Sequence, residues 1–234
     1  MACSRQISRV ALAAVIAAGV GLALAPRAQA GGAAAPLDQG SCDAWDVTYK
    51  LNANLELRDT PMGQGDGVFR IGPGQVVLRF ENKGGQPGGG VRMRSYRMRD
   101  YFTIKTKTLF WSTTVVNRTK TRGTPDKCGN VAKGKLYGDK LRWQTKVRGY
   151  RTDGYLTCEG SLCGKFGAPP PGRTDLHIGP NDVPFNPFSF RDGKKVITMA
   201  RTFVTKTDMP KQTGYITLAG REISRACVHV KPCK

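Results

Sequence analysis

Residues 45–57 read WDVTYKLNANLEL, and this stretch decides the fold class. Apolar side chains recur on one parity of the stretch, at Trp45, Val47, Tyr49, Leu51, Leu55 and Leu57. Polar residues fill most of the positions between them. A period of two is typical of a strand with one buried face and one solvated face. The stretch therefore predicts a half-buried β-strand.

Similar short segments follow along the chain, and nearly every gap between them holds Gly, Pro, Asn or Asp, the residues that favour turns. The expected strands cover residues 68–71, 76–80, 91–98, 102–106, 110–121, 140–148, 155–158, 176–178, 185–190, 196–204, 215–218 and 223–230. A turn is expected at 72–74 and a glycine-rich loop at 83–90. This pattern predicts an all-β fold: a single-domain antiparallel β-sandwich or barrel of about ten to twelve short strands, stapled by disulfides.

The first thirty residues have the layout of a cleaved secretory signal. Arg5 and Arg9 precede an apolar run over 10–25, and small residues at 28 and 30 complete a cleavage site. The run is shorter than the roughly 20 residues that a membrane-spanning helix needs. The expected organisation is a signal peptide at 1–30, a flexible lead-in at 31–41 and one all-β domain at 42–234. This predicts a bacterial protein exported to the periplasm or the medium, with no transmembrane segment after processing.

Six cysteines remain once Cys3 leaves with the signal, and an even number in an exported chain indicates disulfides. Cys158 and Cys163 flank a Gly-Ser turn and are expected to close a small ring. Cys227 and Cys233 would lie about 20 Å apart in an extended chain. Their pairing therefore needs a chain reversal, which the segment 231–232 could supply. That pairing leaves Cys42 with Cys128, and the rival pairing joins Cys42 to Cys233.

The charge balance points to an acidic partner. Without residues 1–30 the chain carries 34 basic and 17 acidic residues, a net charge of +17. Such an excess suits an anionic polymer or an envelope surface, including nucleic acid, lipopolysaccharide and acidic polysaccharide. The alternative is that like charge simply keeps an exported protein dispersed. The sequence identifies no protein partner.

Three expected strands carry basic residues on one face each. The candidate polyanion-binding residues are Arg92, Arg94, Lys105, Lys107, Arg118, Lys120 and Arg122. Side chains on one face of a strand recur about every 6.7 Å, so neighbouring strands would align these rows into one patch. Tyr96, Tyr101 and Trp111 are close enough in sequence to offer stacking surfaces. The competing interpretation is an ordinary solvated face with lysines that protect sheet edges.

No cofactor and no metal site is predicted. The glycine loops at 63–67 and 72–74 are followed by expected strands, whereas a dinucleotide loop must open a helix. No cysteine pair has the spacing of a zinc site. The loop at 63–67 occurs once, whereas calcium-binding glycine repeats need stacked neighbours.

Catalysis is not the favoured function, and no catalytic residue is assigned. The two histidines have no metal-binding spacing, and Ser161 does not fit the nucleophile motif of serine hydrolases. The first alternative is a hydrolase of polysaccharide or ester with a loop-borne site around Asp175 and His177. The second is a barrel-type carrier of an apolar ligand, which rests on fold analogy. The favoured function is a non-enzymatic, exported binding or envelope-associated protein with a cationic face for anionic polymers.

Overall fold

The computed structural model describes residues 42–58, 67–107, 111–165, 168–204 and 213–233, with no statement about the side chains of 201–204 and 213. The expected signal peptide and lead-in at 1–41 and the glycine loop at 63–66 lie outside the described residues. No helix in these ranges has the length and apolar character needed to cross a membrane.

The described chain is all-β and antiparallel, as the sequence predicts. Its only helical element in the described ranges is the short 3-10 turn η2 (Asp192–Lys194). The strands are β1 (Ala44–Arg58), β2 (Gly67–Lys83), β3 (Gln86–Lys107), β4 (Ser112–Arg122), β5 (Ala132–Tyr137), β6 (Lys140–Trp143), β7 (Val147–Gly160), β8 (Gly172–Val183), β9 (Phe188–Arg191), β10 (Val196–Val204) and β11 (Thr213–Val228).

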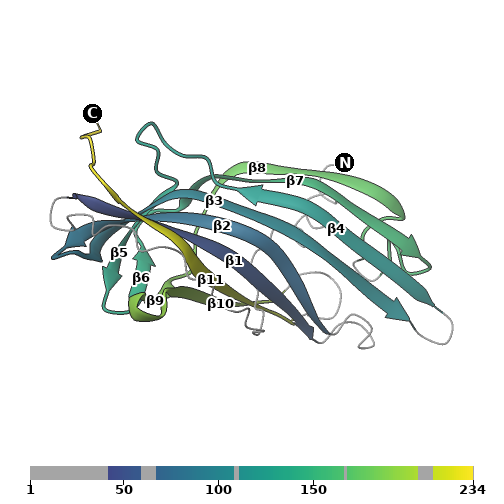
Figure 1. The fold of residues 1–234 in the computed structure, drawn as a ribbon. Coiled ribbons are helices and arrows are strands. Elements are labelled where there is room, and N and C mark those ends of the chain that lie inside the picture. The colour runs from purple at the N-terminus through teal and green to yellow at the C-terminus, as the bar shows by residue number, and fades with distance from the viewer. Residues whose placement is uncertain (1–41, 59–66, 108–110, 166–167, 205–212, 234) are drawn as a thin grey trace.

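The strands form one sheet that closes on itself. Eight of them follow one another in the order β2-β1-β11-β10-β9-β6-β5-β3, and the pairing of β2 with β3 closes the ring. β4, β7 and β8 continue the sheet from residues 97–107 of β3, of which only Arg97 and Met98 also pair with β2. Figure 1 shows β5, β6 and β9 at one end of an elongated molecule, with the long strands running toward the other end.

The ring is filled by apolar side chains. On β1 the odd positions from Val47 to Leu57 are buried, and the even positions are partly or fully exposed. β2, β10 and β11 contribute to the same core. Aromatic rings fill the space between strands, with the ring centroids of Phe80 and Phe190 4.9 Å apart. The side chains of β1 therefore alternate between a buried and an exposed face, as the sequence predicts.

Several strands are longer than the sequence suggests, because irregular positions are accommodated within them. Gly72 and Pro73 do not turn the chain: the β1–β2 register shifts between Leu51 and Ala53, and β2 continues. The β2–β3 ladder begins only at Gly74, so Pro73 has no β3 partner that would need its missing N–H. The segments 91–98 and 102–106 likewise merge into β3, and the expected loop at 83–90 already contains the start of β3.

β5 is a strand that the sequence does not predict. Its sequence AKGKLY holds a glycine and two lysines and little that favours a strand. Hydrogen bonding to β3 on one side and β6 on the other stabilises it. The expected strand at 140–148 is in turn divided between β6 and the start of β7.

Three disulfides are present, and only one has the expected partners. Cys158 pairs with Cys163, as predicted. The pairings of Cys227 with Cys233, of Cys42 with Cys128 and of Cys42 with Cys233 are wrong. The bonds instead join Cys42 to Cys227 and Cys128 to Cys233, each with Cα atoms 5.6 Å apart.

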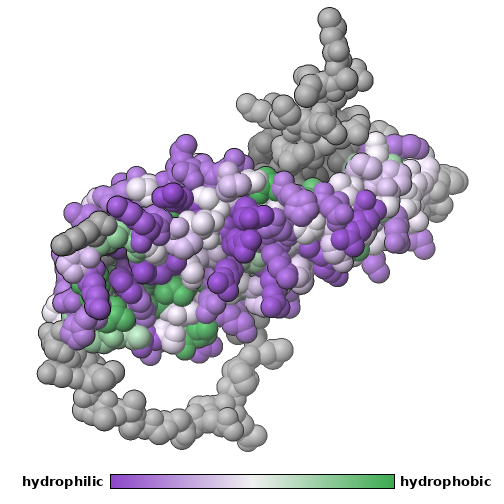
Figure 2. Space-filling view, turned by 90° about the horizontal axis from the view of Figure 1, so that it is seen from above, coloured by the Kyte–Doolittle hydropathy of each residue, from purple (hydrophilic) through white to green (hydrophobic). Residues whose placement is uncertain are grey.

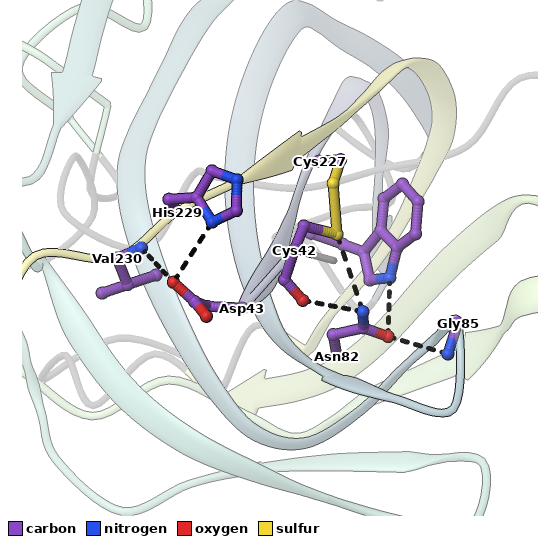
Figure 3. Close-up of a disulfide and its surroundings, with 8 residues drawn as sticks. Cys42, Asp43, Asn82, Gly85, Cys227, His229 and Val230 are labelled. Carbon is purple, nitrogen blue, oxygen red and sulfur yellow. Dashed lines mark hydrogen bonds and ion pairs between the residues drawn. A yellow bond between two sulfur atoms is a disulfide. The ribbon is translucent and has the colours of Figure 1, made fainter. Parts of the chain in front are cut away.

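The ladder between β1 and β11 explains this outcome. It places Trp45 opposite Cys227 and Ala44 opposite Val228, so Cys42, at the start of the described chain, comes beside Cys227. Figure 3 shows the Asn82 side chain beside this disulfide. Its amide nitrogen donates to the Cys42 carbonyl at 2.8 Å, and its side-chain oxygen accepts from the Gly85 N–H at 2.9 Å. No chain reversal after Cys227 is needed.

Candidate anion-binding surface

The candidate surface is the outer face of β3, β4 and β7, which is the face turned away from the core. On β4, positions 118, 120 and 122 point outward, and the alternate positions 117, 119 and 121 are buried. On β3 the outward positions along the pairing with β4 include Arg97, Arg99 and Tyr101. Figure 2, seen from above the view of Figure 1, shows that hydrophilic residues predominate on the visible side of the molecule.

The strand register places cations directly opposite cations. Arg97 faces Arg122, and Arg99 faces Lys120, across the β3–β4 ladder. Arg122 in turn faces Arg151 on β7. Like charges directly opposite one another on adjacent strands destabilise a sheet. The surface therefore maintains an unfavourable arrangement that a bound anion would relieve.

One carboxylate neutralises part of this surface. Asp153 lies 2.9 Å from the Arg151 guanidinium and 3.8 Å from that of Arg122. The hydrogen bond from Arg151 is the main reason that the pKa of Asp153 falls below its ordinary value. Within the described ranges, Arg97, Arg99 and Lys120 form no ion pair. Lys120 lies directly opposite Asp153 on β7, so Arg97 and Arg99 are the uncompensated cations of the surface.

Two tyrosines support cations on the same face. The Arg118 guanidinium lies 5.5 Å from the centroid of the Tyr101 ring, and that of Arg173 lies 4.1 Å from the Tyr155 ring. Arg118 also donates to the backbone carbonyl of Asn117 at 2.9 Å. Its head group is thus held in place. The prediction that Tyr96 offers a stacking surface is wrong, because Tyr96 is buried in the core.

The structure separates the seven cations proposed from the sequence. Arg118, Lys120 and Arg122 lie together on β4. Lys105 and Lys107 share the outer face of β3 but lie opposite Thr114 and Ser112. Six residues of extended chain, about 20 Å, separate Lys105 from Arg99. They form the far margin of the surface and not its centre.

Arg92 and Arg94 belong to the other half of β3. Arg92 is exposed and faces Lys133 on β5 and Arg79 on β2. Arg94 donates to the Cys128 carbonyl at 2.6 Å and to the Asn130 side-chain oxygen at 2.9 Å. Desolvation is the main cause that lowers its pKa. Arg94 therefore fastens the loop that carries Cys128, and Arg92 lies on a separate basic area.

Arg97, Arg99 and Arg151 complete the surface and were not proposed from the sequence. Arg97 lies in an expected strand, but Arg99 lies in the gap that the sequence left between two strands. Only a continuous β3 places both on one face. Arg151 becomes a neighbour of Arg122 through the β4–β7 pairing, which no local pattern indicates.

Asp175 and His177, around which the alternative hydrolase site was predicted, do not contact each other in the hydrogen bonds and ion pairs of the described residues. Asp175 accepts a hydrogen bond from Arg173 at 2.9 Å, and both side chains are exposed. His177 lies 3.3 Å from Asp153 with 75% of its side chain exposed. The two residues thus contact different partners at the solvent-exposed outer surface. No group of three potential metal ligands occurs in the described part of the chain.

No family model, curated protein or solved structure matches this chain.

Proposed function

We propose that this chain is an exported, non-enzymatic protein that binds anionic polymers through the outer face of β3, β4 and β7. The observation that carries the proposal is the opposition of Arg97 to Arg122 and of Arg99 to Lys120. A sheet surface gains nothing in stability from such pairs. Phosphate, sulfate or carboxylate groups along a polymer would offset the repulsion.

The side chains suit this chemistry. A guanidinium group donates two parallel hydrogen bonds to a phosphate or a carboxylate, and lysine adds a mobile point charge. Cations recur about every 6.7 Å along a strand and about every 4.8 Å across the sheet. Such an array contacts a repeating backbone of charges without reading bases or particular sugars. We therefore expect the protein to distinguish polymers by their charge density.

Two features support export. The first thirty residues have the composition of a secretory signal. The described residues contain three disulfides, which persist in the periplasm and outside the cell. A basic protein in either place meets anionic envelope polymers and released nucleic acid. The disulfides and the charge thus favour the same setting.

The test is binding of the purified protein to heparin and to DNA over a range of salt concentrations. We expect DNA affinity to fall steeply with salt, and Arg99→Gln/Lys120→Gln to reduce the slope of log K against log salt by about 2. The matched control is Lys50→Gln/Arg221→Gln, which removes another pair of directly opposed, exposed cations, between β1 and β11. Equal losses in both double variants would mean that net charge alone drives binding, and would refute a defined surface. Salt-independent binding would refute it as well.

A further inference from the structure

The exposed positions of β5 and β6, together with Arg92 on the adjoining part of β3, form a second basic surface. They lie at the end of the molecule that is on the left in Figure 1. The register again sets cations opposite one another, with Arg92 facing Lys133 and Lys135 facing Arg142. We call this group the β5–β6 surface, and its members are Arg92, Lys133, Lys135, Tyr137, Lys140 and Arg142.

The cations of the β5–β6 surface form no ion pair with any residue that the structure describes. Two carboxylates border the surface. Glu81 accepts a hydrogen bond from the backbone N–H of Gly90 at 2.7 Å, and Asp139 lies in the turn between β5 and β6. Neither is within ion-pair distance of these cations, so the surface keeps an excess of positive charge.

Tyr137 gives this surface an exposed aromatic ring, since the residue is 50% exposed. Nζ of Lys135 lies 5.6 Å from the ring centroid, and the guanidinium carbon of Arg142 lies 5.8 Å from it. No other aromatic ring in the described ranges packs against it. The ring and the two cations thus form one solvent-exposed group that offers both a stacking surface and positive charge.

A hollow of about 370 Å³ lies beside Lys133, at the start of β5. Lys146 and Arg148 line it as well, and neither forms an ion pair within the described part of the chain. The carboxylates that line it, Asp126 and Asp182, each already accept a hydrogen bond from a backbone N–H group. Three cations and two carboxylates leave the hollow with a net positive charge, which suits a single phosphate group.

We propose that the β5–β6 surface binds single-stranded nucleic acid, with a base stacked on Tyr137 and phosphates on the cations beside it. Lys133 lies about 13 Å from Tyr137 along β5, with Lys135 halfway between them. A row of cations that follows the backbone, next to an aromatic ring on which a base stacks, is the combination that single-strand-binding proteins use. The hollow beside Lys133 receives a further phosphate. This site goes beyond the outer face of β3, β4 and β7, which would take any polymer of sufficient charge density.

The aromatic ring decides between classes of ligand, because cations alone attract any polyanion. In a duplex the bases are stacked on one another, so their faces are not available to Tyr137. An acidic polysaccharide has anionic groups for Lys135 and Arg142 but no planar aromatic ring. A single strand offers both groups, and stacking tolerates any sequence because every base has a π face.

The test is fluorescence anisotropy of the purified protein with a labelled single-stranded oligonucleotide, with its duplex and with a labelled heparin fragment. Tyr137→Ala should weaken single-strand binding about tenfold, as expected for the loss of one stacked base. Tyr137→Phe keeps the ring and should bind like the wild type. The matched control is Tyr215→Ala on β11, whose ring lies 4.7 Å from the Arg58 guanidinium and which should also bind like the wild type.

The result is separable from the proposed polymer binding through β3, β4 and β7, because all these variants keep every cation. Duplex and heparin affinity should therefore be unchanged in Tyr137→Ala. Unchanged single-strand affinity of the folded variant would overturn the inference, and so would an equal loss for all three ligands. If Tyr137→Ala does not fold, Tyr137→Leu decides the matter, since it retains apolar bulk without an aromatic ring.

Discussion

The two faces of β3, β4 and β7 are made by the same strands but differ in charge and in burial. On β4 the outer positions hold Arg118, Lys120 and Arg122, and the inner positions hold Asn117, Thr119 and Thr121. The outer groups are charged and in contact with water, whereas the inner groups are neutral and buried. Polarity alone therefore does not identify an accessible surface, because the environment decides whether a polar face is open to solvent.

The largest expected effect comes from placing a cation on the wrong face. Thr119→Lys buries an uncompensated ammonium group and should lower the free energy of unfolding by about 3–5 kcal/mol. Thr114→Lys, on the outer face of the same strand, should change it by no more than about 0.5 kcal/mol. Urea denaturation measures both. Similar losses in the two variants would show that the faces are not distinct environments.

Asp100 makes the inner face sensitive to pH. Its pKa of about 8 in the folded protein lies above the ordinary carboxyl value, so the folded state holds more protons between about pH 4 and pH 8. Stability should thus fall as pH rises through this window, by about 1.4 kcal/mol per pH unit from this group, and level off above it.

The variant Asp100→Asn isolates that contribution, because its amide oxygen can still accept the Thr121 hydroxyl. From pH 5 to pH 7 the wild type should lose about 3 kcal/mol relative to the variant. Thermal unfolding of both proteins across the pH range provides the comparison. Parallel curves would show that Asp100 titrates normally and that its burial has no electrostatic cost.

Asn117 tests whether the inner face is organised for stability. Its unpaired amide should destabilise the fold, so the nearly isosteric Asn117→Leu should raise the free energy of unfolding by about 1–2 kcal/mol. Denaturant titration at fixed pH is the measurement. A decrease of similar size in the free energy of unfolding would instead mean that the Asn117 amide stabilises the sheet.

The smallest effect is expected on the outer face. Arg99→Gln removes one of two opposed cations and leaves Lys120 opposite Asp153, so it should stabilise the protein by about 0.5 kcal/mol at low salt. The gain should vanish near 1 M salt, where the screening length is about 3 Å. Stability measured at the two salt concentrations sharpens the comparison, since inner-face variants should show little salt dependence. A gain that persists at high salt would contradict an electrostatic origin.

Sequence reasoning succeeded where the information is local. The alternation in 45–57 specifies β1, and the short loop between Cys158 and Cys163 specifies their disulfide. The parity of 118, 120 and 122 places three cations on one face. Prediction from the sequence failed where segments far apart in the chain pair. β5 is stabilised by hydrogen bonds to β3 and β6, and the β1–β11 ladder brings Cys42 to Cys227.

The amino-acid sequence by itself determined that this chain forms antiparallel strands. Side chains on a strand alternate between two faces, and the apolar residues of 45–57 recur with that period of two. Tertiary structure alone decided which face is enclosed. Threonine and asparagine at positions 117, 119 and 121 would suit a solvated face equally well. Only the β3–β4 register, which sets them opposite the buried residues Phe102, Asp100 and Met98, puts them on the buried side. Burial depends on residues that are distant in the sequence, and a local sequence pattern does not show which of them will become neighbours.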